Sequence, residues 1–285
     1  MRPAINPSLE LFDDVIEQLA VDPRTSPHSP DWIRQSVVLG GEKAKIMRYI
    51  WSHASERYGE APRVLDVGAQ IGAFALYAAR TGCKVAAVDL EMFTRIYAAI
   101  LADYGVDYRA CDVGSDPLPF EDGTFDAVTY NDVIEHHSFS PKKVLREIHR
   151  VLNPGGLIFV STPNHASIYN RMLLLLGKSI NDPFRAYFDS SDDQPVYLGH
   201  HREYTRAELR YALEHTGFAV RECRVVDEDI RALVYYLRRR ASRAEVFANS
   251  RALLVRLLGS IWSPLRLPFG RVLWAVGEKR AQSFK

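Results

Sequence analysis

The chain is poor in cysteine and contains no long apolar run. Its three cysteines are odd in number and lack metal-type spacing, which predicts buried free thiols in a reducing compartment. No run approaches the ~18 apolar residues of a membrane span, and Met1–Asp14 lacks the apolar core of a secretory leader. The net charge is only +1, and 47% of the residues are hydrophobic. We therefore expect a cytoplasmic protein with one sizeable core.

The segment Val64–Ala75 lacks the complete glycine pattern of a dinucleotide-binding turn. Its apolar start predicts a strand buried on both faces, and the chain then turns and enters a helix at Ala73. Gly68 and Gly72 permit a tight turn and a close ligand approach. A dinucleotide site requires G-x-G-x-x-G, but Gln70 and Ala73 occupy the second and third glycine positions. The corner predicts a nucleotide-like ligand of another kind.

The acidic residue before this turn favours a particular cofactor. Asp66 gives the corner the form D-x-G-A-Q-x-G, which resembles motif I of class I S-adenosylmethionine (SAM) methyltransferases. The resemblance implies that Asp66 helps to hold the amino-acid end of SAM, and that Gly68, Gln70 and Gly72 line the cofactor. It also implies an α/β fold with a Rossmann-like, doubly wound, mainly parallel seven-stranded sheet. From the layout of the chain we expect N-terminal helices, a lid insertion after strand five and a C-terminal helical extension.

Later motifs extend the resemblance over roughly residues 62–222. Asp89 ends the second predicted strand, 21 residues after Gly68, where the family binds the ribose hydroxyls. The alternative role for Asp89 is an N-cap of the helix that begins at Glu91. Asp112 follows the third predicted strand, where the family commonly binds the adenine amino group. We also assign Asn131, after strand four, to the cofactor.

A cluster of acids and histidines after strand four predicts the acceptor site. If this segment forms a helical turn, Asp132, Glu135 and His136 share one face. Together with Ser161–Asn164 and His200, the pattern resembles small-RNA 2′-O-methyltransferases and ubiquinone-pathway O-methyltransferases. Both segments follow strands of the sheet, so we expect the two histidines to converge on one site.

The RNA-methylating relatives imply a divalent ion held by Asp132, Glu135, His136 and His200. Two carboxylates and two imidazoles suit Mg²⁺, Mn²⁺ or Fe²⁺ better than structural zinc. Without a metal, His136 or His200 is the candidate catalytic base, because imidazole titrates near neutral pH. A third alternative is that the histidine only lines the pocket.

The sequence predicts three parts. Residues 1–59 form an N-terminal helical cap, with a helix that begins after Ser8 and another over 41–58. Residues 60–236 form the methyltransferase domain. Its insertion at about 165–201 follows strand five and is expected to act as a lid over the acceptor pocket. Residues 237–285 form a basic tail.

The tail is the part of the chain with a net positive charge. It holds eleven basic and two acidic residues, and its arginines alternate with apolar clusters that include Trp262 and Trp274. This composition predicts amphipathic helices outside the core that lie on an anionic membrane. The alternatives are helices packed on the fold or on a second subunit as a homodimer, and a nucleic-acid patch. The membrane interpretation places the protein peripherally, at the inner face of the membrane.

The predicted activity is O-methylation of a hydroxyl on a small molecule, a glycan or a lipid-linked acceptor. The runner-up is an RNA 2′-O-methyltransferase. A protein of a different class, a catalytically silent SAM-binding scaffold at a membrane, is favoured by Gln70 and by the long tail. The retained carboxylates at 66, 89 and 112 favour an enzyme.

Overall fold

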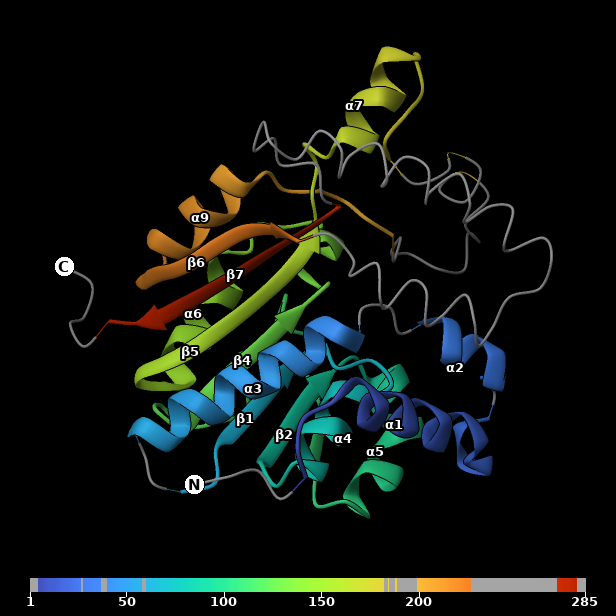
Figure 1. The fold of residues 1–285 in the computed structure, drawn as a ribbon, viewed down its shortest axis with the longest axis vertical. Helices are drawn as coiled ribbons and strands as arrows, with labels where there is room; N and C mark the ends of the chain where they lie inside the picture. Colours follow the sequence, from blue (N-terminus) through green and yellow to red (C-terminus); the bar gives the residue numbers. More distant parts are fainter. Residues whose placement is uncertain are drawn as a thin grey trace.

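A seven-stranded sheet with helices on both faces organises the chain (Figure 1). The computed structural model describes residues 5–26, 28–36, 40–57, 60–181, 184, 188, 199–226 and 271–280. The strands are β1 (Arg63–Val67), β2 (Lys84–Asp89), β3 (Asp107–Ala110), β4 (Phe125–Asn131), β5 (Leu152–Pro163), β6 (Phe218–Val226) and β7 (Val272–Lys279). Their order is β3-β2-β1-β4-β5-β7-β6. Strands β1 to β5 pair in parallel, whereas β7 is antiparallel to both of its neighbours.

Helices cover the two faces of the sheet as separate layers. The helices and 3-10 turns are α1 (Leu9–Val21), η1 (Pro23–Thr25), α2 (Pro30–Ser36), α3 (Gly40–Arg57), α4 (Ala73–Arg80), α5 (Glu91–Ala102), η2 (Ile134–His136), α6 (Lys142–Val151), α7 (Ile168–Leu175) and α9 (Arg206–Glu214). One core cluster joins α1, α3, α4 and α5 to the sheet, and another joins α6 and α9 to it. Figure 1 shows α3 crossing the face of the sheet. The predicted Rossmann-like, mainly parallel seven-stranded fold is confirmed.

Local sequence signals explain where several helices begin. The Ser8 hydroxyl accepts a hydrogen bond from the backbone N–H of Leu11 and caps α1, as predicted. Thr205 and Glu208 form a reciprocal capping box at the start of α9. These caps satisfy N–H groups that have no partner inside the helix.

The last strand corrects the prediction for the tail. Val272–Lys279 is not an amphipathic helix outside the core: it is β7, inserted between β5 and β6. Trp274, assigned to a membrane face, is 3% exposed, and its ring lies 6.3 Å from that of Phe159. A strand buried on both faces is a continuous apolar run, which periodicity cannot distinguish from a helical segment. The domain boundary at 236 is therefore wrong for these residues, while residues 237–270 lie outside those described.

The predicted lid leaves and re-enters the fold at one edge of the sheet. Asn164 forms a parallel bridge with Tyr204, and the backbone N–H of His165 donates to the Tyr204 carbonyl at 3.0 Å. Helix α7 lies between these two points in the sequence, and most of residues 182–198 lie outside the described part. Within the described residues, no helix is both long and apolar enough to span a bilayer.

Candidate functional site

The turn after β1 has the geometry of a cofactor cradle. Gly68, Gln70 and Gly72 have φ angles of 75°, 50° and 72°. A Cβ at Gly68 would collide with the Val133 side chain, so the close approach requires glycine there. Gln70 adopts this conformation despite its Cβ, because its N–H donates to Asp89 at 2.6 Å and its carbonyl accepts from the Tyr108 hydroxyl at 2.6 Å. The replacement of the usual middle glycine therefore leaves the turn intact.

A buried carboxylate, Asp66, and a half-buried one, Asp89, stand at the ends of β1 and β2. Burial raises the pKa of Asp66 to about 6, and the Asp89 charge adds to the rise. The Thr129 hydroxyl donates to Asp66 at 2.7 Å. Asp89 accepts from the N–H groups of Gln70 and Leu90, each at 2.6 Å. Helix α5 has Leu90 as its N-cap and no side-chain cap, so Asp89 does not have the capping role considered as its alternative.

Asp112 and Asn131 lie at the ends of the neighbouring strands. Asp112 accepts from the Gly114 N–H at 2.9 Å. The Ser161 hydroxyl donates to the amide oxygen of Asn131 at 3.3 Å. The amide nitrogen of Asn131 is buried and has no hydrogen-bond partner among the described residues. An unsatisfied donor at this edge is available to a ligand.

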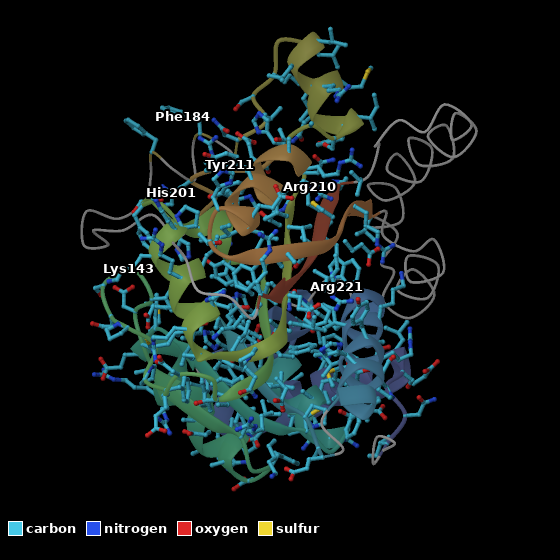
Figure 2. All side chains as sticks on the ribbon, turned by 90° about the vertical axis from the view of Figure 1, so that its left-hand side faces the viewer. Lys143, Phe184, His201, Arg210, Tyr211 and Arg221 are labelled. Atoms are coloured by element: carbon cyan, nitrogen blue, oxygen red, sulfur yellow. The ribbon has the colours of Figure 1, made fainter. Side chains whose placement is uncertain are left out.

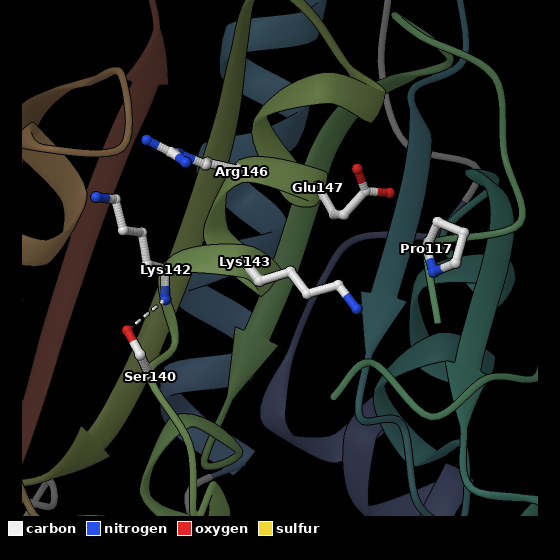
Figure 3. Close-up of a pocket in the computed structure, with 6 residues that line it drawn as sticks. All are labelled: Pro117, Ser140, Lys142, Lys143, Arg146 and Glu147. Carbon is white, nitrogen blue, oxygen red and sulfur yellow. Dashed lines mark hydrogen bonds between the residues drawn. The ribbon is translucent and has the colours of Figure 1, made fainter. Parts of the chain in front are cut away.

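A surface groove beside α6 holds no predicted site residue. Figure 3 shows its lining, which is Pro117, Ser140, Lys142, Lys143, Arg146 and Glu147. The Lys143 ammonium donates to the carbonyls of Gly114 at 3.4 Å and Ser115 at 2.6 Å. Lys143 thus fixes the loop that follows Asp112.

The two candidate histidines meet, as predicted, although 63 residues separate them. The rings of His136 and His200 lie 4.9 Å apart. The Nδ1 atom of His136 lies 3.2 Å from the Gly199 carbonyl, and the Nδ1 atom of His200 lies 3.7 Å from Glu203. A carbonyl only accepts, so Nδ1 of His136 carries the proton and Nε2 is the basic atom.

Glu135 completes this group from a buried position. One ligand atom each from Glu135, His136 and His200 lie within 4.8 Å of one another. The Thr162 hydroxyl donates to Glu135 at 3.0 Å, and the Glu135 carbonyl accepts from the His201 N–H at 2.8 Å. Burial raises the pKa of Glu135 to about 8, and the nearby Asp132 charge adds to the rise. The group thus places a buried carboxyl, whose protonated form is favoured by burial, beside two imidazoles.

Asp132 does not share the helical face predicted for it. The turn η2 begins at Ile134, and Asp132 lies before it with a left-handed φ of 56°. Its carboxylate accepts from the Ser161 hydroxyl at 2.9 Å and lies 3.7 Å from the Lys43 ammonium. The structure therefore brings together three of the four predicted metal-binding residues and turns Asp132 toward a cation.

Two residues of this site, Lys43 and Glu203, are not among those predicted from the sequence. Lys43 is buried on α3 and faces Asp132, and its charge also acts on Asp66. The sequence does contain a signal for Lys43: it lies three residues before the buried Ile46, on the apolar face of a predicted helix, where a lysine is unusual. Glu203 beside His200 had no comparable signal, because only the folded chain brings its carboxylate to the imidazole.

His137 belongs to a separate cluster. Its Nε2 is hydrogen-bonded to the Tyr130 hydroxyl, and its ring stacks on Phe139 at 4.5 Å. Burial lowers the pKa of His137 to about 4, so the imidazole is neutral. This residue packs the loop after β4 rather than joining His136 and His200.

The family of the chain follows from these features and from its matches to known proteins. Residues 42–222, more than half of the chain, match the model of a family described as a methyltransferase domain. The chain belongs to this family. A SAM-dependent methyltransferase of Mesorhizobium loti has a similar fold, with a TM-score of 0.53, 18% identity, and coverage of 83% of this chain and 97% of that one.

Curated relatives match a shorter region. A sarcosine/dimethylglycine N-methyltransferase of Halorhodospira halochloris is 37% identical over 119 residues, 40% of this chain and 42% of the relative. A ubiquinone biosynthesis O-methyltransferase of Xanthomonas oryzae pv. oryzae is 38% identical over 106 residues, 36% of this chain and 43% of the relative. The chain thus matches about two fifths of the length of each relative. By their names, one relative methylates nitrogen and the other oxygen.

The family and the fold imply SAM as the cofactor, and the residues at the turn fit it. Gly68 has no Cβ, which lets the turn lie directly against the Val133 side chain just after β4. The carboxylate of Asp89 stands at the carboxyl end of β2, and Asn131 offers an unsatisfied amide donor. Ligands of doubly wound sheets bind at this edge, outside the carboxyl ends of the strands.

Proposed function

We propose that the protein is a SAM-dependent O-methyltransferase that acts on a hydroxyl of a small-molecule, glycan or lipid-linked acceptor. The observation that carries this proposal is the convergence of His136 and His200 beside the cofactor turn. Val133, whose side chain limits the space at Gly68, lies three residues before His136. The cofactor turn is therefore next to the acid–histidine group, which consists of Glu135, His136 and His200. The ubiquinone-pathway relative supports an oxygen acceptor.

The chemistry requires alignment and removal of a proton. Methyl transfer from a sulfonium is an in-line displacement, in which the acceptor oxygen attacks the methyl carbon and the sulfur leaves with the bonding electron pair. The acceptor hydroxyl must lose its proton to a base. The Nε2 atom of His136 is suited to this role because the Gly199 carbonyl holds Nδ1 protonated. His200, beside Glu203, is the second candidate base.

A divalent ion remains a second proposal for the same residues. Glu135, His136 and His200 would hold it, and their donor set of one carboxylate and two imidazoles suits Mn²⁺ or Fe²⁺ better than Mg²⁺. Such an ion would bind the acceptor oxygen and lower its pKa. Titration of the protein with Mn²⁺, followed by electron paramagnetic resonance, tests the proposal. His200→Gln should abolish bound Mn²⁺, while the control His215→Gln, at the C-cap of α9, should retain it.

Methyl-labelled SAM tests the activity directly. The protein should transfer the label to catechols, polyprenylated phenols or sugar hydroxyls, and mass spectrometry of the product should place the methyl group on oxygen. Replacing the base in His136→Ala should lower turnover roughly 10²-fold or more while SAM affinity is retained. Transfer only to amines such as sarcosine would instead favour the chemistry named for the Halorhodospira relative. Binding of SAM without transfer to any acceptor class would favour a silent scaffold.

A further inference from the structure

Helix α7 has the burial pattern of a helix that lacks a partner. Of its eight described residues, the one buried side chain is the polar Asn170. Met172, Leu174 and Leu175 are 48%, 56% and 80% exposed, and Leu176, directly after the helix, is 66% exposed. A helix of a soluble domain normally turns its apolar face toward the core. Adjacent exposed leucines of this kind mark a docking surface.

Among the described residues, local contacts hold this helix in place without covering its apolar side. Ser167 caps its N-terminus, and the backbone N–H of Lys178 donates to the Leu173 carbonyl at its C-terminal end. Asn170 donates to the carbonyls of Asn164 and His165, at 3.3 and 3.1 Å. Helices this short are marginal in water unless something packs against them. The N-terminal end of α7 is held to the fold, whereas the leucines near its C-terminal end are exposed. We therefore expect another surface to pack against these leucines.

The cations of residues 166–181 favour an anionic surface, although the acidic Asp182 follows this stretch. Residues 166–181 contain Arg171 and Lys178 and no acidic residue. A third cation, the Arg271 guanidinium, lies 5.0 Å from the centre of the Tyr169 ring at the base of the helix. Leucines flanked by exposed cations are the pattern of a segment that inserts at the headgroup boundary of an anionic membrane.

We propose that α7 with Leu176 and Lys178 docks the protein onto an anionic lipid bilayer. Figure 1 shows α7 projecting from the body of the fold, and Figure 2 labels Phe184, which is 71% exposed, at the same end of the molecule. Asn170 of this helix also donates to Glu203 at 3.0 Å, and Glu203 neighbours His200. Docking through α7 therefore places the acceptor site close to the lipid surface.

Vesicle co-sedimentation of the full chain tests the proposal without any assay of methyl transfer. The wild type should pellet with vesicles of phosphatidylcholine and phosphatidylglycerol, and more weakly with phosphatidylcholine alone. The double variant Leu175→Ser/Leu176→Ser should reduce partitioning roughly tenfold or more. Both side chains are exposed, so the melting temperature should not change. The matched control Met92→Ser, 51% exposed on α5, should pellet like the wild type.

A second variant tests how much the positive charge of Lys178 contributes to membrane binding. Lys178→Glu should weaken binding to the anionic vesicles by on the order of tenfold and leave binding to neutral vesicles unchanged. Equal pelleting of the double variant and the wild type would overturn the proposal, because the protein would then bind through another segment. The proposal would also be overturned if light scattering showed the wild type as a dimer and the double variant as a monomer. A second copy of the chain, rather than a membrane, would then cover α7.

Discussion

At the scale of single residues, the contacts of Asp89 favour a role in cofactor binding over a role as a helix cap. Both of its oxygens already accept backbone N–H groups, and neither caps α5. If the carboxylate also accepts the ribose hydroxyls, Asp89→Ala should weaken SAM binding by about 2–4 kcal/mol. Isothermal titration calorimetry measures this change, with the exposed Glu121→Gln as control. Unchanged affinity in a folded Asp89→Ala variant would contradict the assignment.

Asp66 predicts a pH dependence of stability in the cofactor-free protein. Its pKa in the fold is about 6, against about 3.9 in an unfolded chain. The folded state therefore binds the proton more tightly, so this contribution to stability is complete below pH 4 and is lost as the pH rises through 6. The loss amounts to about 3 kcal/mol.

Denaturant unfolding at a series of pH values isolates this effect. The stability of Asp66→Asn relative to the wild type should increase between pH 4 and 7. Saturating SAM should flatten that increase, because its ammonium group favours the ionised carboxylate. A constant difference between the two proteins at every pH would contradict the account.

At the scale of secondary-structure elements, β7 joins the end of the chain to the methyltransferase core. The strand lies between β5 and β6, and Trp274 is buried in the sheet. Truncation after Leu237 removes this strand, so we expect loss of the folded protein rather than the intact SAM binding that an external tail would permit. The milder Trp274→Ala should cost about 3–5 kcal/mol of unfolding free energy. Denaturation curves measure it, and a cost below 1 kcal/mol would contradict the central placement.

The sequence predicted those elements whose signals are local. The strand ends at Asp66 and Asp89 and the cap at Ser8 each have a sequence signal that spans only a few residues. The left-handed Asp132 had no such signal, because its conformation accompanies bonds to Ser161 on β5. The strand β7 was missed for a related reason. Its pairing partners β5 and β6 lie far away in the sequence, and a run buried on both faces has no period.

At the scale of the whole molecule, the fold brings the cofactor turn, the acid–histidine group and the base of α7 to one edge of the sheet. β1, β4 and β5 supply the turn, the group and the lid from their carboxyl ends. Lys43, from α3, adds a buried cation beside Asp132. This arrangement predicts one continuous site, in which the methyl group of SAM faces His136 and His200.

A crystal structure of the protein with S-adenosylhomocysteine tests this claim most directly. We expect density for the product over residues 68–72, with the ribose on Asp89 and the sulfur directed toward the space between His136 and His200. Density at another place, or a sulfur that faces away from both histidines at saturating ligand, would contradict it.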